Sequence, residues 1–94
     1  LLHERGEVGG AEMHYRLALA ARPDDPIAAY DLGVALQDQS RLEEAAQAYQ
    51  MALTADAANA DAHYNLAAVY EAMGQRQAAF RHFKSYRALT GKAS

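Results

Sequence analysis

The residues of this chain that could do chemistry are its histidines and two pairs of adjacent acids, Asp24-Asp25 and Glu43-Glu44. No H-E-x-x-H motif, P-loop or G-x-G-x-x-G motif is present. Asp24 and Asp25 stand directly before Pro26, which is the arrangement of a helix start rather than of a paired-acid site. We therefore expect no catalytic residue, no metal and no cofactor. The four histidines lie in different predicted helices: His3, His14, His63 and His82.

Composition limits the class of protein further. The chain has 94 residues, no cysteine and a net charge of −3, so it fits one small domain without disulfides. No apolar run is long enough to suggest a membrane span, and the first residues lack a signal peptide's apolar stretch. We expect no membrane association and favour a cytoplasmic location.

Charge is unevenly distributed along the chain. All twelve acids lie in residues 1–71, beside four bases, whereas residues 72–94 hold five bases and no acid. The basic segment is a weak signal for nucleic-acid binding, because the isoelectric point of the whole domain is only about 5.7. Two interpretations stay open: the bases solvate the end of the molecule, or they grip an anionic partner.

A 34-residue repeat organises the sequence. A fixed period of this length is typical of stacked-repeat architectures, in which each unit needs a neighbour to bury its apolar face. The period aligns small residues with small ones and large with large: Ala11, Ala45 and Ala79; Tyr15, Tyr49 and Phe83; Tyr30 and Tyr64; Leu32 and Leu66; Gly33 and Ala67.

The apolar spacing within each repeat is that of helices. Ala45, Ala48, Tyr49, Ala52 and Leu53 form one continuous stripe at i, i+3, i+4, i+7 and i+8. We predict a short helix over 1–5 and helices over 8–21, 26–38, 42–55, 60–73 and 76–89. Asp25 should cap one helix, and Gly74 should end another in the left-handed conformation.

The pattern resembles the tetratricopeptide repeat (TPR) family, which carries W-x2-L-G-x2-Y, then A-x3-F, then P over 34 residues. Residues 26–59 supply Leu32-Gly33 and Ala45-x3-Tyr49, and residues 60–93 supply Leu66-Ala67 and Ala79-x3-Phe83. The resemblance implies an all-α superhelix of antiparallel helix pairs. We expect one domain over 1–94: a partial repeat at 1–25, then repeats at 26–59 and 60–93, about 2.7 in all.

The resemblance also implies a binding surface, because in TPR proteins the leading helices line a concave groove. His3 and Glu4 of the first short helix would join the following residues: Ile27, Tyr30, Asp31, Val34, Gln37, Asp38, Asp61, Tyr64, Asn65, Ala68 and Glu71. The chaperone-binding subclass holds a carboxylate with basic residues; acids stand there instead, so we exclude a carboxylate clamp. Asn65 matches the asparagine that holds a peptide backbone in some members.

The acids and tyrosines of this groove predict a basic or aromatic peptide, through charge complementarity and cation–π contacts. A structural reading remains beside it, in which Tyr30 and Tyr64 are buried repeat residues and the acids are solvated helix surface. The predicted function is a non-catalytic protein–protein interaction module. The alternatives are a structural segment of a longer array and a regulatory segment of a larger protein, for example a bacterial regulator. Because the chain opens within a repeat, we also expect an exposed apolar end that could make it a homo-oligomer.

Overall fold

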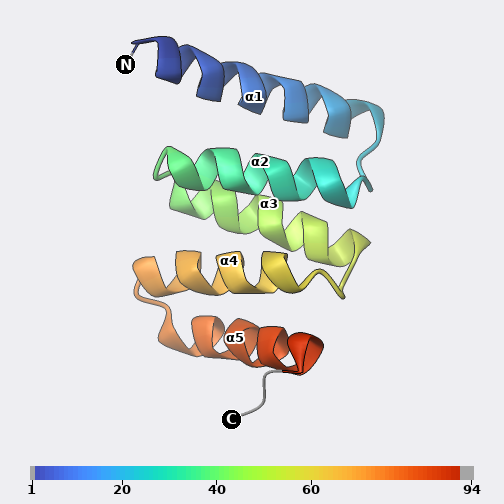
Figure 1. The fold of residues 1–94 in the computed structure, drawn as a ribbon, viewed down its shortest axis with the longest axis vertical. Helices are drawn as coiled ribbons and strands as arrows, with labels where there is room; N and C mark the ends of the chain where they lie inside the picture. Colours follow the sequence, from blue (N-terminus) through green and yellow to red (C-terminus); the bar gives the residue numbers. More distant parts are fainter. Residues whose placement is uncertain (1, 92–94) are drawn as a thin grey trace.

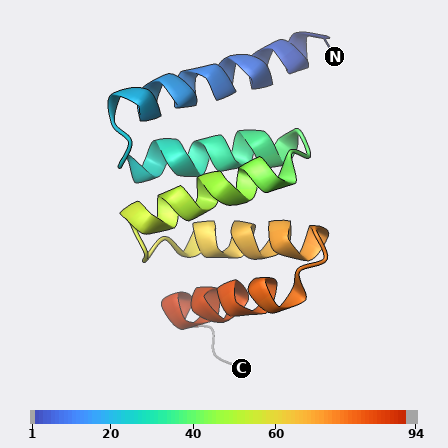
Figure 2. The ribbon, with the colours of Figure 1, turned by 180° about the vertical axis from the view of Figure 1, so that it is seen from behind.

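The computed structural model describes the backbone of residues 2–91 and the side chains of residues 10–91, and the described backbone is helical throughout apart from short connections. The five helices follow one another down the long axis of the molecule, with the two chain ends at opposite ends (Figure 1). The reverse view shows the same order (Figure 2). The helices are α1 (Leu2–Ala21), α2 (Pro26–Asp38), α3 (Leu42–Ala55), α4 (Ala60–Ala72) and α5 (Arg76–Thr90).

Helices α2 and α3 form one antiparallel hairpin, and α4 and α5 form the next; α1 packs on α2, and α3 packs on α4. The molecule measures 42 × 28 × 19 Å, which is an elongated stack rather than a sphere. The predicted all-α superhelix of helix pairs is therefore confirmed.

Local sequence sets the helix ends. Asp25 is extended and its Oδ1 accepts the backbone N–H groups of Ile27 (3.0 Å) and Ala28 (3.2 Å), so it caps α2 as predicted. Asn59 caps α4 in the same way, accepting from Ala62 at 3.0 Å. Gly74 adopts a φ of 79° between α4 and α5, the left-handed geometry expected of it. The predicted bounds of these helices agree with the structure to within one residue.

The start of the chain differs from the prediction. A short helix over 1–5 and a second helix over 8–21 were expected, but Leu2–Ala21 is one helix that runs through Gly6, Gly9 and Gly10. Continuing α1 through this segment adds one hydrogen bond for each residue fixed, which offsets the poor helix propensity of glycine. The predicted groove positions His3 and Glu4 lie on this segment, outside the described side chains.

The core follows the repeat. Ala45, Tyr49 and Leu66 have no exposed surface, and Ala79 is 4% exposed, as their small and large positions predicted. The equivalent residues of the first repeat, Ala11 and Tyr15, are only half-buried. Each helix pair is therefore covered fully only where a second pair packs against it, as stacked repeats require.

Candidate functional site: the α2–α4 face

Three of the predicted groove residues meet in one hydrogen-bonded cluster, together with a tyrosine that was assigned only to packing. Asn65 of α4 donates from Nδ2 to the hydroxyls of Tyr30 on α2 (3.0 Å) and Tyr49 on α3 (3.4 Å). The Tyr49 hydroxyl donates to Oε1 of Gln37 at 2.6 Å. The rings of Tyr30 and Tyr49 also touch, with centroids 5.7 Å apart. We call the surface around this cluster the α2–α4 face.

The chemistry of these groups fixes the direction of each bond. The Gln37 oxygen can only accept, so Tyr49 gives it the hydroxyl proton and takes a proton from Asn65. Both amide protons of Asn65 are then used, one on each tyrosine. Among the described residues, the bonds leave Oδ1 of Asn65 as an acceptor and the Tyr30 hydroxyl as a donor. If Asn65 binds a peptide backbone as predicted, its side chain can therefore only accept a hydrogen bond from a backbone N–H group.

Three aspartates give this face a negative field. The pKa of Tyr30 is raised, first by burial and then by the nearby carboxylates of Asp61 and Asp31. Burial also raises the pKa of Tyr49, and Asp38 and Tyr30 add to that effect. Asp31 and Asp61 thus act on the Tyr30 hydroxyl and Asp38 acts on the Tyr49 hydroxyl, although the three acids come from two helices. The cluster therefore lies in an environment that favours a positive ligand.

The remaining predicted site residues lie apart from this cluster. Tyr64 is 48% exposed, and its ring meets those of Phe83 (5.5 Å) and Tyr86 (5.1 Å) on α5. Among the side chains of residues 10–91, Ile27 is the most exposed large apolar one, at 71%, and it lies in the first turn of α2. The three predicted groove residues not yet described differ in burial. Val34 packs on the core, Ala68 is half-buried and Glu71 is exposed.

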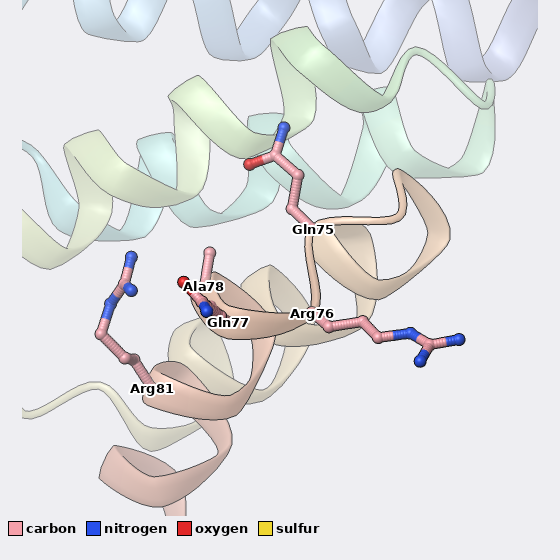
Figure 3. Close-up of a pocket in the computed structure, with 5 residues that line it drawn as sticks. All are labelled: Gln75, Arg76, Gln77, Ala78 and Arg81. Carbon is pink, nitrogen blue, oxygen red and sulfur yellow. The ribbon is translucent and has the colours of Figure 1, made fainter.

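The basic segment of the sequence forms the last helix. A shallow pocket at the start of α5 is lined by Gln75, Arg76, Gln77, Ala78 and Arg81. Figure 3 shows that the side chains of Arg76 and Arg81 extend in different directions, so their guanidinium groups do not converge on one point. This divergence agrees with the interpretation in which the bases solvate the end of the stack.

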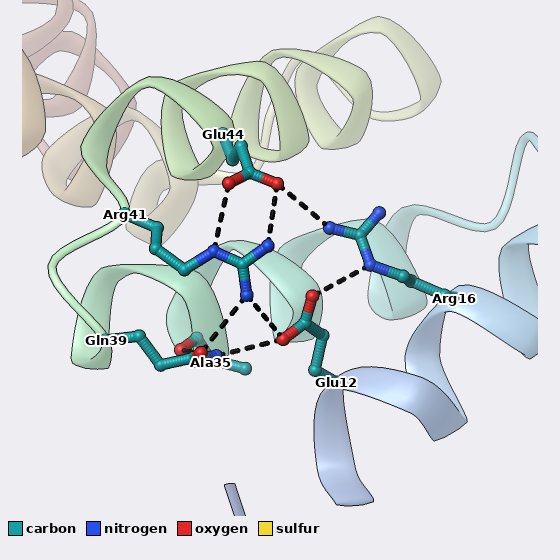
Figure 4. Close-up of polar contacts among 6 residues, drawn as sticks. All are labelled: Glu12, Arg16, Ala35, Gln39, Arg41 and Glu44. Atoms are coloured by element: carbon teal, nitrogen blue, oxygen red, sulfur yellow. Dashed lines mark hydrogen bonds and ion pairs between the residues drawn. The ribbon is translucent and has the colours of Figure 1, made fainter. Parts of the chain in front are cut away.

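An ion-pair cluster that the sequence did not predict joins α1 to the α2–α3 hairpin (Figure 4). Glu12 of α1 receives Arg41 at 2.7 Å and Arg16 at 2.9 Å, and Glu44 of α3 receives Arg41 at 2.8 Å and Arg16 at 3.3 Å. Gln39 donates to Glu12 at 3.1 Å. The i, i+4 pair of Glu12 and Arg16 was visible in the sequence; the contacts between helices were not, because 27 to 29 residues separate the partners.

The sequence also did not predict a contact between two histidines. His63 of α4 and His82 of α5 approach through their Nδ1 atoms, at 3.0 Å. Within residues 10–91 no group of three or more His, Cys, Asp or Glu side chains is arranged to hold a metal ion. None of the helices within residues 2–91 combines the length and apolar character needed to cross a membrane.

Comparison with known proteins agrees with this architecture. The family described as TPR repeat matches residues 35–74. No curated protein sequence matches the chain. Similar solved structures include MamA AMB-1, at 28% identity and a TM-score of 0.87 over 97% of this chain and 50% of that one. A MamA RS-1 double mutant has 25% identity and a TM-score of 0.87 over 97% and 51%. MamA MSR-1 has 29% identity and a TM-score of 0.74 over 93% and 53%.

Residues 35–74 therefore match the tetratricopeptide repeat family, and the helices stack as they do in the MamA structures. It spans about half the length of the MamA structures that it matches. The matched segment, 35–74, runs from the middle repeat into the last one, so it crosses the predicted boundary between residues 59 and 60. The repeat boundaries themselves stay a prediction.

Proposed function

We propose that this chain is a non-catalytic protein-binding module and that its α2–α4 face holds a segment of a partner protein. The TPR repeat match and the stacked helix pairs support the general role. The observation that carries the specific proposal is the orientation of the Asn65 cluster. Its bonds leave an amide oxygen and three nearby carboxylates for a ligand that donates hydrogen bonds.

The ligand chemistry follows from this acceptor set. A guanidinium group carries five N–H donors in a planar fork and stacks on aromatic rings, which suits the Asn65 oxygen, Asp61 and the Tyr30 ring. An ammonium group supplies charge without the fork. The preferred partner segment is therefore basic and contains arginine, with an aromatic or apolar residue for the exposed side chains of Ile27 and Tyr64.

Fluorescence anisotropy with labelled peptides tests this proposal. A peptide that carries arginine and an aromatic residue should bind more tightly than its lysine counterpart, and a matched acidic peptide should not bind. Changing Asp31→Asn or Asp61→Asn should weaken binding by up to about fivefold for each carboxylate, as expected for exposed charge pairs. Asp24→Asn, which removes the same charge from the α1–α2 connection, is the control.

Equal affinity for acidic and basic peptides would overturn the assignment of the ligand. An absence of binding by every peptide, with the fold intact, would favour the alternative of a structural segment. The regulatory alternative predicts instead that the α2–α4 face contacts another domain of a larger protein.

Self-association is a second candidate function, favoured by one observation on α1. Met13 and Leu17 are each 65% exposed and line a shallow pocket with Glu12 and Arg16. Burying these two side chains against a second copy would remove the apolar surface from water. Sedimentation of the unchanged chain and of Met13→Lys/Leu17→Lys tests this: a dimer that the double substitution dissociates supports it, and a monomer in both excludes it.

A further inference from the structure

Two histidines occupy, in the last hairpin, the positions that two buried alanines occupy one repeat earlier. The 34-residue spacing relates His63 to Ala29 and His82 to Ala48. The alanines are only 1% and 3% exposed, and the histidines are half-buried. Two apolar core positions are therefore replaced, in α4 and α5, by side chains that carry an ionisable imidazole ring.

The bonds of His63 define which nitrogen carries each proton. Its Nε2 lies 3.2 Å from the carbonyl oxygen of Ala57, and a carbonyl can only accept, so Nε2 holds the proton of the neutral ring. Its Nδ1 is then a lone-pair acceptor. The contact at 3.0 Å must therefore be a hydrogen bond that His82 donates from Nδ1.

The orientation of the rings distinguishes this bond from a metal site. The ring centroids are 5.2 Å apart while the Nδ1 atoms are 3.0 Å apart, so the rings meet edge to edge with the two nitrogens pointing at each other. Two metal ligands would instead direct their lone pairs at a third point about 2.0–2.1 Å from each nitrogen. The geometry is therefore that of a hydrogen bond, with a proton between the two Nδ1 atoms.

The surroundings of the pair contain little to stabilise positive charge. From α4, His82 faces His63 and the Tyr70 ring (centroids 5.7 Å apart), and Tyr70 is bonded to the neutral Gln50 of α3. On α5 itself the nearby charge is Arg81. The acid of the α3–α4 connection, Asp56, uses Oδ1 to accept the Ala58 N–H at 3.1 Å. None of the ion pairs between described residues includes either histidine.

We propose that the His63–His82 bond is a pH-sensitive clamp that fixes α5 to α4 while at least one imidazole is neutral and releases α5 when both are protonated. A first proton leaves the bond in place, because charged His82 still donates to neutral His63. A second proton puts an N–H group on both sides of the contact, removes its acceptor and places two positive rings together beside Arg81.

The titration of His82 acts in the same direction. Burial first, and then the neighbouring His63 and Arg81, lower its pKa below the ordinary value of 6.5. The unfolded chain therefore takes up this proton more readily than the folded chain. The stability that the neutral ring provides is complete above 6.5 and is lost as pH falls through the folded pKa.

Release of α5 would also change the surface next to the α2–α4 face. Tyr64 packs edge-on against Phe83 and Tyr86 of α5, so it loses both ring contacts when α5 leaves. Lowering the pH would therefore expose more of the Tyr64 side chain and of the apolar side of α4. The clamp itself does not depend on what the α2–α4 face binds.

Hydrogen exchange of backbone amides at pH 7.5 and pH 5.0, corrected for intrinsic rates, tests the clamp. Protection of α5 should fall by up to about tenfold in the acid sample, the change expected when one net hydrogen bond is lost. The double variant His63→Ala/His82→Ala installs the residues of the preceding repeat and should lose this pH dependence. His14→Ala, an exposed histidine on α1, should keep it.

Three results would overturn the proposal: no fall in α5 protection, an equal fall in α3 and α5, or an equal fall in the double variant. If the double variant does not fold, nitrogen-15 titration of the unchanged chain decides. A neutral His63 with its proton on Nε2 and a His82 that titrates below 6.5 support the clamp. The opposite His63 tautomer, or a His82 that titrates at or above 6.5, contradicts it.

Discussion

The backbone of Gly33 lies directly against the ring of Tyr49. A Cβ at Gly33 would stand 2.6 Å from Cδ1 and Cε1 of that ring. Tyr49 cannot move aside easily, because it has no exposed surface and its hydroxyl is bonded to Gln37 and Asn65. This close contact between α2 and α3 therefore also supports the polar cluster of the α2–α4 face.

Gly33→Ala should destabilise the chain despite the better helix propensity of alanine. The clash with Tyr49 costs about 1–3 kcal/mol, as in other overpacked cores, and the propensity gain offsets at most about 1 kcal/mol of it. Gly10→Ala is the matched control, since nothing lies within 4 Å of a Cβ there; it should stabilise by up to about 1 kcal/mol. Urea unfolding measures both, and a Gly33→Ala variant as stable as Gly10→Ala would refute the close contact.

The start of α2 depends on one side chain. Asp25→Ala removes the acceptor for two backbone N–H groups and should lower the free energy of unfolding by about 0.5–2 kcal/mol. Asp24→Ala changes an exposed neighbour of the same type and should leave stability within about 0.5 kcal/mol. The two variants are compared by thermal unfolding, and equal losses would show that Asp25 is not the cap.

The ion-pair cluster of α1 should make the chain sensitive to acid. The pKa of Glu12 is lowered, first by the hydrogen bond from Arg16 and then by those from Gln39 and Arg41. A lowered folded pKa means that this stabilisation is present above the ordinary value of 4.5 and is lost as pH falls through the folded value.

Glu12→Gln should therefore be less stable than the unchanged chain at pH 6, and the two should converge as pH falls through the folded pKa of Glu12, where its carboxyl group takes up a proton. Glu43→Gln, an exposed acid on α3 outside the ion-pair cluster, serves as the control and should retain the acid sensitivity. Unfolding curves at several pH values decide the matter; a constant difference between Glu12→Gln and the unchanged chain would show that Glu12 does not titrate within this range.

The helices and the core were predictable because their signals are local or periodic. Asp25, Pro26 and Gly74 mark helix ends within a few residues of sequence, and the repeat identifies Ala45 and Tyr49 as buried. The continuous α1 was not predicted, because the repeat placed a turn near Gly6. Continuing one helix through Gly6 adds a hydrogen bond for each residue fixed, and the repeat pattern does not report that gain.

The candidate site was predicted only in outline. The repeat placed Tyr30 and Asn65 on leading helices. It did not predict the hydrogen bond between them, because they are 35 positions apart in the sequence. It also did not predict that the Tyr49 hydroxyl accepts a hydrogen bond from Asn65. The His63–His82 contact had a usable signal, since both residues stand where the preceding repeat has buried alanines. Its proton arrangement required the carbonyl of Ala57, which no sequence pattern indicates.

We propose that the α2–α4 face holds an arginine-bearing segment of another protein. The most direct measurement is NMR mapping of the nitrogen-15-labelled chain during titration with an arginine- and tyrosine-containing peptide. The predicted result is a set of saturable shifts on α2 and α4 that includes the side-chain amide of Asn65. Shifts confined to Met13 and Leu17 on α1, or to the basic residues of α5, would contradict the claim.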